Sequence, residues 1–371
     1  MYAGKLISSD DHVFEPRDLW TSRVSRAQQA AVPHVVREDD GDWWMWKGHK
    51  LLSFGPGTQP GQRFEKWEDV KLIDREEHLL PGGYDPKQRL KDMEIEKMEA
   101  GVLYTTVAIA LYHFAPSDEL TLLLRHYNDW LADFCAASPG RLKGICLLNT
   151  DDVFSAVEEM RRCKKRGHVG ALIATWPGDD RQYFLKEYEP LWAAAQDMQM
   201  PLHMHLGGNR PGRNNELQKP RGLTPSFKTN FDYWVRMSMA DMILSGVFER
   251  FPKLMVGSVE QELAWIPHFI ERMNYSYTQR APVKGDYRFE EKMLPGDYFH
   301  RNCFASFQQD AIGIRLRDLI GVQCMLWGSD YPHIESTFPR SREILGKILA
   351  GCTEKEKTAI VYGNAKRIYG L

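Results

Sequence analysis

From residue 85 to the end, the chain alternates short apolar runs with stretches whose apolar residues recur at helical spacing. Residues 86–100 carry Leu90, Met93 and Met98 in a charged background, which is typical of a helix, and the apolar run at 101–108 predicts a buried strand. The same alternation predicts strands at 142–148, 169–175, 201–206, 254–259, 303–307 and 323–327, and helices at 118–138, 153–160, 191–198, 341–349 and 354–362.

One more apolar run, at 6–12, opens the chain and brings the number of expected strands to eight. Eight strands separated by helices in 371 residues are typical of a (β/α)8 TIM barrel, an α/β fold. An open, doubly wound sheet that binds a nucleotide would need a glycine-rich turn after its first strand, and residues 10–16 contain no glycine. We therefore expect residues 1–371 to form a single barrel domain.

The segment 17–86 interrupts this rhythm, because it shows little periodicity and mixes Trp20, Trp43, Trp44, Trp46 and Trp67 with glycine, proline and charged residues. Its aromatic content argues against disorder. We expect an insertion within the barrel that either packs its own aromatic cluster on the surface or covers the substrate as a lid. A dimer contact is a further alternative, because tryptophan is enriched at such interfaces, and we expect a homodimer.

The net charge of −2 provides no general attraction for nucleic acid or an anionic membrane, so we expect a small-molecule substrate. No apolar stretch approaches the length of a membrane span. The six cysteines are dispersed without a C-x-x-C pair, and most lie within apolar runs. This usage predicts buried thiols in a reducing compartment, and hence a cytoplasmic protein.

Candidate chemistry lies where the predicted strands end, which is where barrel enzymes place their active sites. Asp10 and His12 close the first strand and share a face, because strand side chains alternate. His205 ends the fifth strand, and Asp330 follows the eighth. Asp10, His12, His205 and Asp330 are expected to converge on one divalent ion, and this mixed nitrogen and oxygen set suits Zn, Mn or Fe.

The neighbouring polar residues each have more than one interpretation. His203 is either an interior histidine that supports the site or a further ligand. Glu260 is a candidate general base, a ligand of a second metal, or the partner of a basic side chain. Glu15 and His333 are expected to move protons or to bind a second ion. Asp330 itself has the alternative of capping the turn that follows it.

Several stretches together resemble the amidohydrolase-related family that includes aminocarboxymuconate semialdehyde decarboxylase and resorcylate decarboxylase. They are residues 7–16, 245–254, 265–267, 328–333 and 363–365. The resemblance implies a metal-dependent barrel with Asp10, His12, His205 and Asp330 at the family's ligand positions. The chain departs from the semialdehyde decarboxylase branch in having Asp10 rather than a first histidine, and Glu260 where that branch has a catalytic histidine.

We therefore expect a metal-dependent hydrolase or decarboxylase that acts on a small aromatic or polycyclic carboxylic acid or amide through metal-activated water. Glu260 or His333 is expected to move protons. Arg210 and Arg213 follow the fifth strand and are expected either to bind a substrate carboxylate or to be solvated loop residues, while Trp176 would line an apolar pocket. The alternatives are a dinuclear non-heme iron oxygenase, with two metals per chain, and a barrel without catalytic activity.

Overall fold

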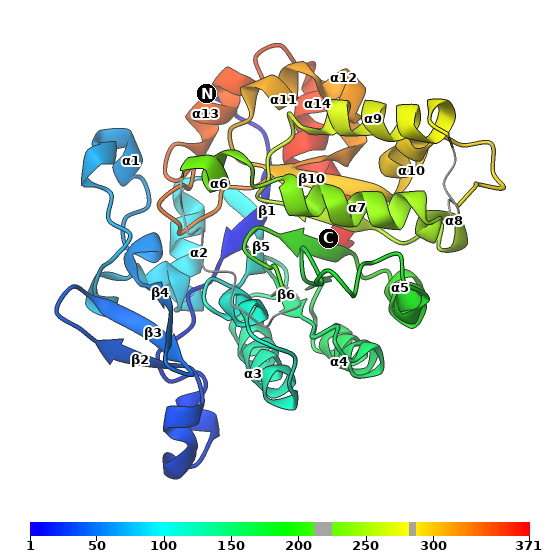
Figure 1. Cartoon of the computed structure of the whole chain (residues 1–371). Coiled ribbons are helices and arrows are strands. Elements are labelled where there is room, and N and C mark those ends of the chain that lie inside the picture. Colours follow the sequence, from blue (N-terminus) through cyan, green and yellow to red (C-terminus); the bar gives the residue numbers. More distant parts are fainter. Residues whose placement is uncertain (211–224, 282–286) are drawn as a thin grey trace.

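Eight parallel strands form one sheet, and within this sheet each strand pairs with the next of the eight in chain order (Figure 1). The computed structural model describes residues 1–210, 225–281 and 287–371. The strands of this sheet are β1 (Leu6–His12), β5 (Met98–Tyr104), β6 (Leu142–Leu147), β7 (Gly170–Leu172), β8 (Leu202–His205), β9 (Val256–Val259), β10 (Cys303–Phe307) and β11 (Met325–Trp327). The order confirms the predicted (β/α)8 barrel.

Polar contacts join the two end strands of the sheet, β1 and β11, and so complete the barrel. The amide of Asp330 donates to the carbonyl of Asp10 at 2.7 Å, and the Ser9 hydroxyl donates to the carbonyl of Trp327 at 2.9 Å. Gly328 allows this approach, because a Cβ atom there would lie 2.3 Å from the Cβ of Asp10. The two strands that carry the first and last predicted ligands are therefore held edge to edge.

Helices lie outside the strands (Figure 1). In α3, Ser117 caps the first turn and a stripe that includes Leu120, Leu124 and Leu131 is buried. The barrel helices are α2 (Pro86–Ile95), α3 (Asp118–Cys135), α4 (Val153–Lys165), α5 (Glu189–Asp197), α7 (Tyr233–Leu244), α8 (Val247–Arg250), α9 (Ile266–Gln279), α10 (Pro295–Asn302), α11 (Ala311–Arg315), α12 (Arg317–Ile320), α13 (Ser341–Ile348), α14 (Glu354–Thr358) and α15 (Asn364–Tyr369).

The predicted boundaries are wrong by a few residues around β5. Helix α2 ends at Ile95 rather than near residue 100, and Lys97 just after it adopts a left-handed backbone with φ of 51°. The strand begins at Met98 and ends at Tyr104, earlier than predicted at both ends. Beyond its end, the amides of Val107 and Ala108 donate to the carboxylate of Glu15. This contact turns the chain away from the sheet after Tyr104.

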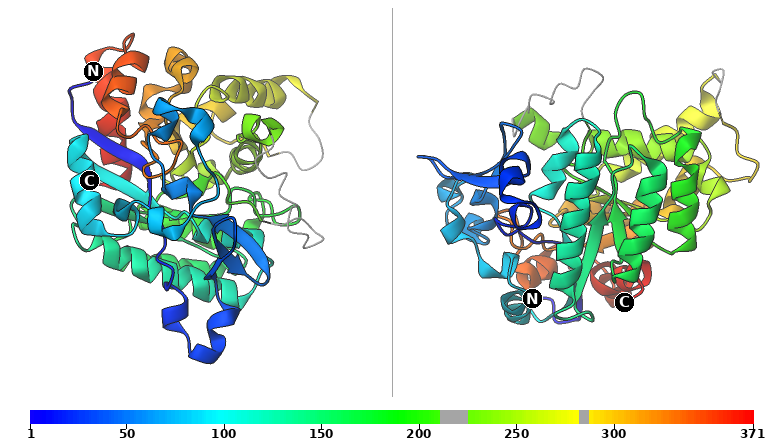
Figure 2. Two further views of the ribbon diagram at one scale, coloured as in Figure 1. Left: turned by 90° about the vertical axis from the view of Figure 1, so that its left-hand side faces the viewer. Right: turned by 90° about the horizontal axis from the view of Figure 1, so that it is seen from below.

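The segment 17–86 contains an antiparallel sheet that the sequence pattern did not predict. Its strands are β2 (His34–Arg37), β3 (Asp42–Trp46) and β4 (His49–Ser53). The segment also contains the short helix α1 (Gln62–Glu65). The remaining α-helix of the described residues, α6 (Pro225–Thr229), lies later in the chain. The small sheet stands to one side of the barrel (Figure 2).

Most tryptophans of this segment pack inward. Trp20, Trp44 and Trp46 are fully buried, and the Trp20 and Trp44 rings meet edge to face at 5.2 Å. The Trp20 indole donates to the carbonyl of Leu123 in α3, and the Trp46 ring lies 4.4 Å from Phe114. These contacts support the interpretation of an internal aromatic cluster.

The C-terminal helix α15 contributes to the interior of the barrel. The Tyr369 ring stacks on His203 with centroids 5.6 Å apart, and it also lies near Phe304. All six cysteines are buried and free. Among the described residues no helix is both long and apolar enough to cross a membrane.

Replacing Gly328 with alanine should destabilise the fold by about 1–3 kcal/mol, because the new methyl group would overlap Asp10 where β1 meets β11. Urea denaturation measures the change. Gly140→Ala is the matched control, since a Cβ atom at Gly140 has no neighbour within 4 Å. Equal stability of the two variants would contradict the tight approach of β1 and β11.

Candidate metal centre

The ends of β1 and β8 and the loop after β11 bring the four predicted ligands together. His12 Nε2 lies 3.2 Å from His205 Nε2, 3.6 Å from Asp10 Oδ1 and 3.3 Å from Asp330 Oδ1. His205 Nε2 is 3.5 Å from the same Asp10 oxygen. Asp10, His12 and His205 form one set whose ligand atoms could hold a metal ion, and His12, Asp330 and His333 form a second.

Backbone carbonyls orient both imidazoles. His12 Nδ1 lies 2.7 Å from the carbonyl oxygen of Thr105, and His205 Nδ1 lies 2.9 Å from that of Leu206. A carbonyl oxygen only accepts, so Nδ1 of each ring carries a proton and Nε2 is the atom that faces the centre. This is the arrangement that a metal-binding histidine requires.

Two buried carboxylate oxygens at the centre lack a protein donor. Asp10 is 1% exposed and Asp330 is fully buried, yet neither Asp10 Oδ1 nor Asp330 Oδ2 accepts a hydrogen bond from any described residue. Buried carboxylates are ordinarily paired, hydrogen-bonded or bound to a metal. Asp10 Oδ1 also lies 3.6 Å from His12 Nε2 and 3.5 Å from His205 Nε2, so this oxygen and the two ring nitrogens fit a divalent cation.

The electrostatics of the centre agree with this fit. Burial, followed by the charge of Asp10, raises the pKa of Asp330 well above its usual range. Burial lowers the pKa of His205, but the neighbouring carboxylates of Asp10 and Glu260 outweigh it and raise this pKa to about 9. The raised pKa of His205 reflects the negative charge that Asp10 and Glu260 bring to the centre.

Glu260 lies at the edge of the centre. Its Oε2 is 3.4 Å from His205 Nε2, and its side chain is 14% exposed. Burial, followed by the charge of Asp330, raises the pKa of Glu260 well above its usual range. Glu260 also has a left-handed backbone, with φ of 61°, as does Asp330, with φ of 62°. Such backbone strain in non-glycine residues concentrates at functional sites.

His333 contacts Asp330 and Thr106, which follows β5. Its Nδ1 lies 2.9 Å from Asp330 Oδ1, its Nε2 lies 2.9 Å from the Thr106 hydroxyl, and its ring centroid is 4.0 Å from that of His12. Burial, followed by the charge of His205, lowers its pKa to about 4. His333 is therefore a neutral group that bridges Asp330 and Thr106.

Glu15 and His203 are both engaged away from the centre. The Glu15 carboxylate accepts from the Thr105 hydroxyl and from the amides of Val107 and Ala108. His203 Nδ1 lies 2.7 Å from the Tyr104 hydroxyl, and burial lowers the pKa of His203 to about 3. These contacts favour a supporting role for both residues over metal binding.

The residues predicted to meet the substrate are placed differently. The Arg210 guanidinium is 4% exposed, donates to the carbonyls of Tyr112 and Phe114, and pairs with Asp151. These contacts occupy it as a structural group rather than a free carboxylate receptor. Arg213 lies outside the described residues.

Trp176 belongs to an aromatic pair beyond the end of β7. The Trp176 ring lies 5.2 Å from that of Trp234, and its indole donates to Asp179 at 3.2 Å. Trp176 is joined to the loop after β8, because its carbonyl accepts from the amide of Arg210. Its predicted role in lining the substrate pocket stays a prediction.

Sequence reasoning missed two arginines near the centre. Arg63, in α1, is half-buried and donates to the carbonyl of Ser336 at 3.1 and 3.0 Å. Arg89, in α2, is fully buried beside β1 and donates to the carbonyl of His12 at 2.9 Å. Neither position carries a signal in the sequence, because each arginine stands among other charged residues in a helix or a loop.

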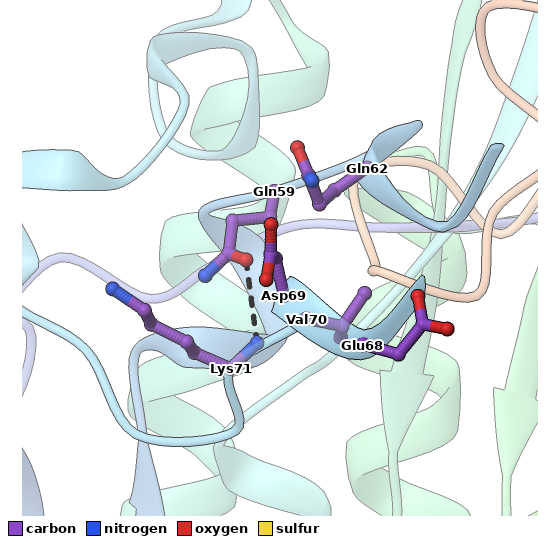
Figure 3. Close-up of a pocket in the computed structure, with 6 residues that line it drawn as sticks. All are labelled: Gln59, Gln62, Glu68, Asp69, Val70 and Lys71. Atoms are coloured by element: carbon purple, nitrogen blue, oxygen red, sulfur yellow. Dashed lines mark hydrogen bonds between the residues drawn. The ribbon is translucent and has the colours of Figure 1, made fainter. Parts of the chain in front are cut away.

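A hollow of about 520 Å³ lies apart from the centre, within the segment 17–86 (Figure 3). The amide of Lys71 donates to Gln59 Oε1 there at 3.3 Å. Its lining residues are Gln59, Gln62, Glu68, Asp69, Val70 and Lys71, none of which belongs to the metal centre. Its position therefore carries no information about the chemistry at the strand ends.

A (β/α)8 barrel with histidine and aspartate side chains gathered at its strand ends defines a class of barrel enzymes with hydrolase or lyase activity. The sequence profile of one such family, described as amidohydrolase, matches residues 106–371. The chain belongs to the amidohydrolase family, and it is an enzyme of that superfamily, a hydrolase or carboxy-lyase.

Two relatives extend the resemblance over most of the chain. Gamma-resorcylate decarboxylase from Rhizobium sp. (strain MTP-10005) is 27% identical over 365 residues, which cover 94% of this chain and 98% of that protein. The 2-amino-3-carboxymuconate-6-semialdehyde decarboxylase of Dictyostelium discoideum is 25% identical over 299 residues, covering 78% of this chain and 77% of that protein.

Solved structures agree on the fold. An amidohydrolase from Mycobacterium avium subsp. paratuberculosis K-10 superimposes with a TM-score of 0.75 at 22% identity, covering 99% of each chain. A dihydroxybenzoic acid decarboxylase from Polaromonas sp. JS666, solved with manganese and the inhibitor 2-nitroresorcinol, gives a TM-score of 0.68 at 19% identity, covering 100% of this chain and 98% of that one. At these identities the likeness establishes the barrel alone.

Removing divalent metal with a chelator should lower the free energy of unfolding, because the carboxylates of Asp10 and Asp330 then lose the cation that offsets their charge. Free Mn²⁺ at about one hundred times its dissociation constant should restore about 2.7 kcal/mol. Chemical denaturation with and without Mn²⁺ measures the difference. Identical denaturation curves with and without Mn²⁺ would contradict a metal centre.

Proposed function

We propose that the chain is a metal-dependent decarboxylase of a small aromatic carboxylic acid. The observation that carries the proposal is the convergence of Asp10, His12, His205 and Asp330, with two unpartnered carboxylate oxygens, at the strand ends of the barrel. The decarboxylases among the relatives favour loss of CO2 over hydrolysis. One divalent ion would occupy the centre, and two carboxylates in its shell favour manganese or iron over zinc.

Bound at this site, the ion would supply Lewis-acid polarisation of a substrate oxygen. The residues around it orient the substrate and move a proton. Loss of CO2 from an aromatic carboxylate breaks the bond between ring and carboxyl carbon, and the ring carbon then needs a proton. We propose that Glu260 delivers it, because its Oε2 lies 3.4 Å from His205 Nε2 at the edge of the centre, and burial, followed by the charge of Asp330, raises the pKa of its carboxyl group.

His333 is the second candidate for moving a proton. It is neutral, and it lies between Asp330 and Thr106 at 2.9 Å from each. These two hydrogen bonds hold its ring against that of His12. We therefore propose that His333 fixes the orientation of Asp330, while Glu260 carries the proton.

Arg63 is the proposed receptor for the substrate carboxylate. Its guanidinium is half-buried, and the acidic groups that act on it include Glu335, Asp330 and Glu262. It donates to the carbonyl of Ser336 and to the amide oxygen of Gln309, and its planar fork of donors would suit a carboxylate that replaces one of these acceptors. Because Arg63 belongs to the segment 17–86, we propose that this segment is an insertion within a single barrel domain, residues 1–371, that contributes to the substrate site.

A dinuclear iron oxygenase is the second candidate. The observation in its favour is the second set of possible ligands, His12, Asp330 and His333, together with Glu260 near His205. Against it, His12 Nδ1 is bonded to the carbonyl of Thr105, so His12 offers only Nε2 and serves one ion. Two irons per chain and substrate-dependent uptake of O2 would favour the oxygenase.

Exposed apolar side chains bear on the association of the chain, and buried thiols bear on its location. Trp67 is 70% exposed, and Leu72 and Tyr84 are also exposed, which supports a homodimer that uses the segment 17–86. Light scattering tests this proposal, because a monomeric mass would refute it. Six buried free thiols support a reducing compartment such as the cytoplasm, which localisation of a tagged chain tests.

The decarboxylase proposal is tested by metal content and CO2 release. Protein purified without chelator should contain about one divalent ion per chain and release CO2 from at least one member of a panel of hydroxybenzoic acids. Asp330→Ala should lower metal affinity at least tenfold and abolish the release. Asp318→Ala, which removes an exposed carboxylate of α12, should do neither.

Two outcomes would contradict the proposal. Unchanged metal content in Asp330→Ala would favour a barrel without catalytic activity. Hydrolysis of an amide or ester without any CO2 release would place the chain among the hydrolases instead.

Replacing Arg63 with methionine should raise KM for an aromatic acid about tenfold and leave metal content unchanged, because a charge-assisted contact to the carboxylate is lost. Steady-state kinetics measure the effect. Arg340→Met is the matched control, since both guanidinium groups lie over the Phe64 ring, at 4.4 Å for Arg63 and 5.3 Å for Arg340. An equal effect of both variants would argue against a substrate contact at Arg63.

A further inference from the structure

Four polar residues behind the metal centre, Ser8, Asp11, Arg89 and Ser329, form a connected set that we call the polar seam. We propose that the polar seam positions the ligands of β1 relative to Asp330, and so sets the metal affinity of the centre. This inference rests on the proposed metal-dependent function. None of the four residues of the polar seam is a proposed metal ligand or substrate contact, so they are positioning residues.

Asp11 is the hub of the polar seam. It points to the opposite face of β1 from Asp10 and His12, and it is 2% exposed. Its Oδ1 accepts from the hydroxyls of Ser8 and Ser329, each at 2.6 Å, while its Oδ2 lies 3.6 Å from Arg89 Nη2. One carboxylate thus joins β1, the loop after β11 and helix α2.

Arg89 contacts the backbone on both sides of the metal centre, at β1 and at the loop after β11. Its guanidinium donates to the carbonyl of His12 at 2.9 Å and to that of Tyr331 at 3.5 Å, and it lies over the Tyr331 ring at 4.6 Å. His12 is itself a proposed ligand, and Tyr331 follows Asp330. This one guanidinium therefore couples the backbone on the two sides of the centre.

The backbone at this place needs such support. Ser329 donates its amide to the Ser8 hydroxyl at 2.8 Å, and the Ser329 hydroxyl accepts from the amide of Tyr331 at 3.2 Å. These two bonds flank Asp330, whose φ of 62° is unfavourable for a residue other than glycine. The seam therefore holds the strained residue that carries a ligand.

A role in the stability of the fold alone does not account for the buried pair of Asp11 and Arg89. Burying an ion pair costs desolvation energy, and well-packed apolar residues are often at least as stabilising. Ligand geometry, by contrast, tolerates little error, and loss of a group that supports a metal ligand typically costs 10- to 100-fold in affinity.

The test compares Ser329→Ala with Ser53→Ala. Each serine is 2% exposed, donates from its hydroxyl and accepts from one amide. The Ser53 hydroxyl donates to the carbonyls of Asp42 and Asp74, and Ser53 lies in the small sheet at the side of the barrel. Calorimetric titration of metal-free protein with Mn²⁺ should show affinity about tenfold weaker for Ser329→Ala and unchanged for Ser53→Ala. The unfolding midpoints of both variants should fall by similar amounts.

Ser8→Ala, which removes a seam hydroxyl from the other strand, should reproduce the loss if Ser329→Ala does not fold. The electron paramagnetic resonance spectrum of bound Mn²⁺ should also broaden or shift in both seam variants. Wild-type affinity in the seam variants would overturn the inference and leave the metal centre intact. A wild-type protein that binds no Mn²⁺ would overturn both.

Discussion

Asp10, Asp330 and Glu260 bring three carboxylates to the mouth of the barrel, where little solvent reaches them. Removing a carboxylate from water costs several kcal/mol, and repulsion between neighbouring carboxylates adds to that cost. Burial and neighbouring carboxylates raise the pKa values of Asp330 and Glu260, and the carboxylates of Asp10 and Glu260 raise the pKa of His205, so each shift favours the protonated form. A divalent cation relieves the same imbalance, so proton release and metal binding are linked.

The surrounding structure holds these charges in place. Left-handed backbone at Asp330 and Glu260 aims both side chains toward His12 and His205, and carbonyl groups fix which imidazole nitrogen faces inward. The contacts between β1 and the loop after β11 combine backbone hydrogen bonds, from Asp330 to Asp10 and from His12 to Tyr331, with those of the Ser8, Asp11 and Ser329 side chains. Closure of the barrel and assembly of the centre are therefore parts of the same set of interactions.

Much of the fold follows from local pattern, as β1 and β10 show by matching their predicted residues. Asp10 and His12 were predictable as neighbours because strand alternation fixes their common face. The sheet β2–β4 was not predictable, because the alternation in β3 is carried by tryptophans on both faces.

Other features depend on contacts distant in sequence. Arg89 and Asp11 lie 78 positions apart, and nothing local distinguishes Arg89 from a solvated helix residue. The place of Arg210 after β8 suggested either a substrate contact or a solvated loop residue, whereas its guanidinium is buried against Asp151 and two carbonyls that are distant in sequence. The central claim is that Asp10, His12, His205 and Asp330 bind one ion. An anomalous difference map from crystals grown with Mn²⁺ should show a single peak bonded to all four side chains. A map without a peak there, or with two peaks, would contradict the account.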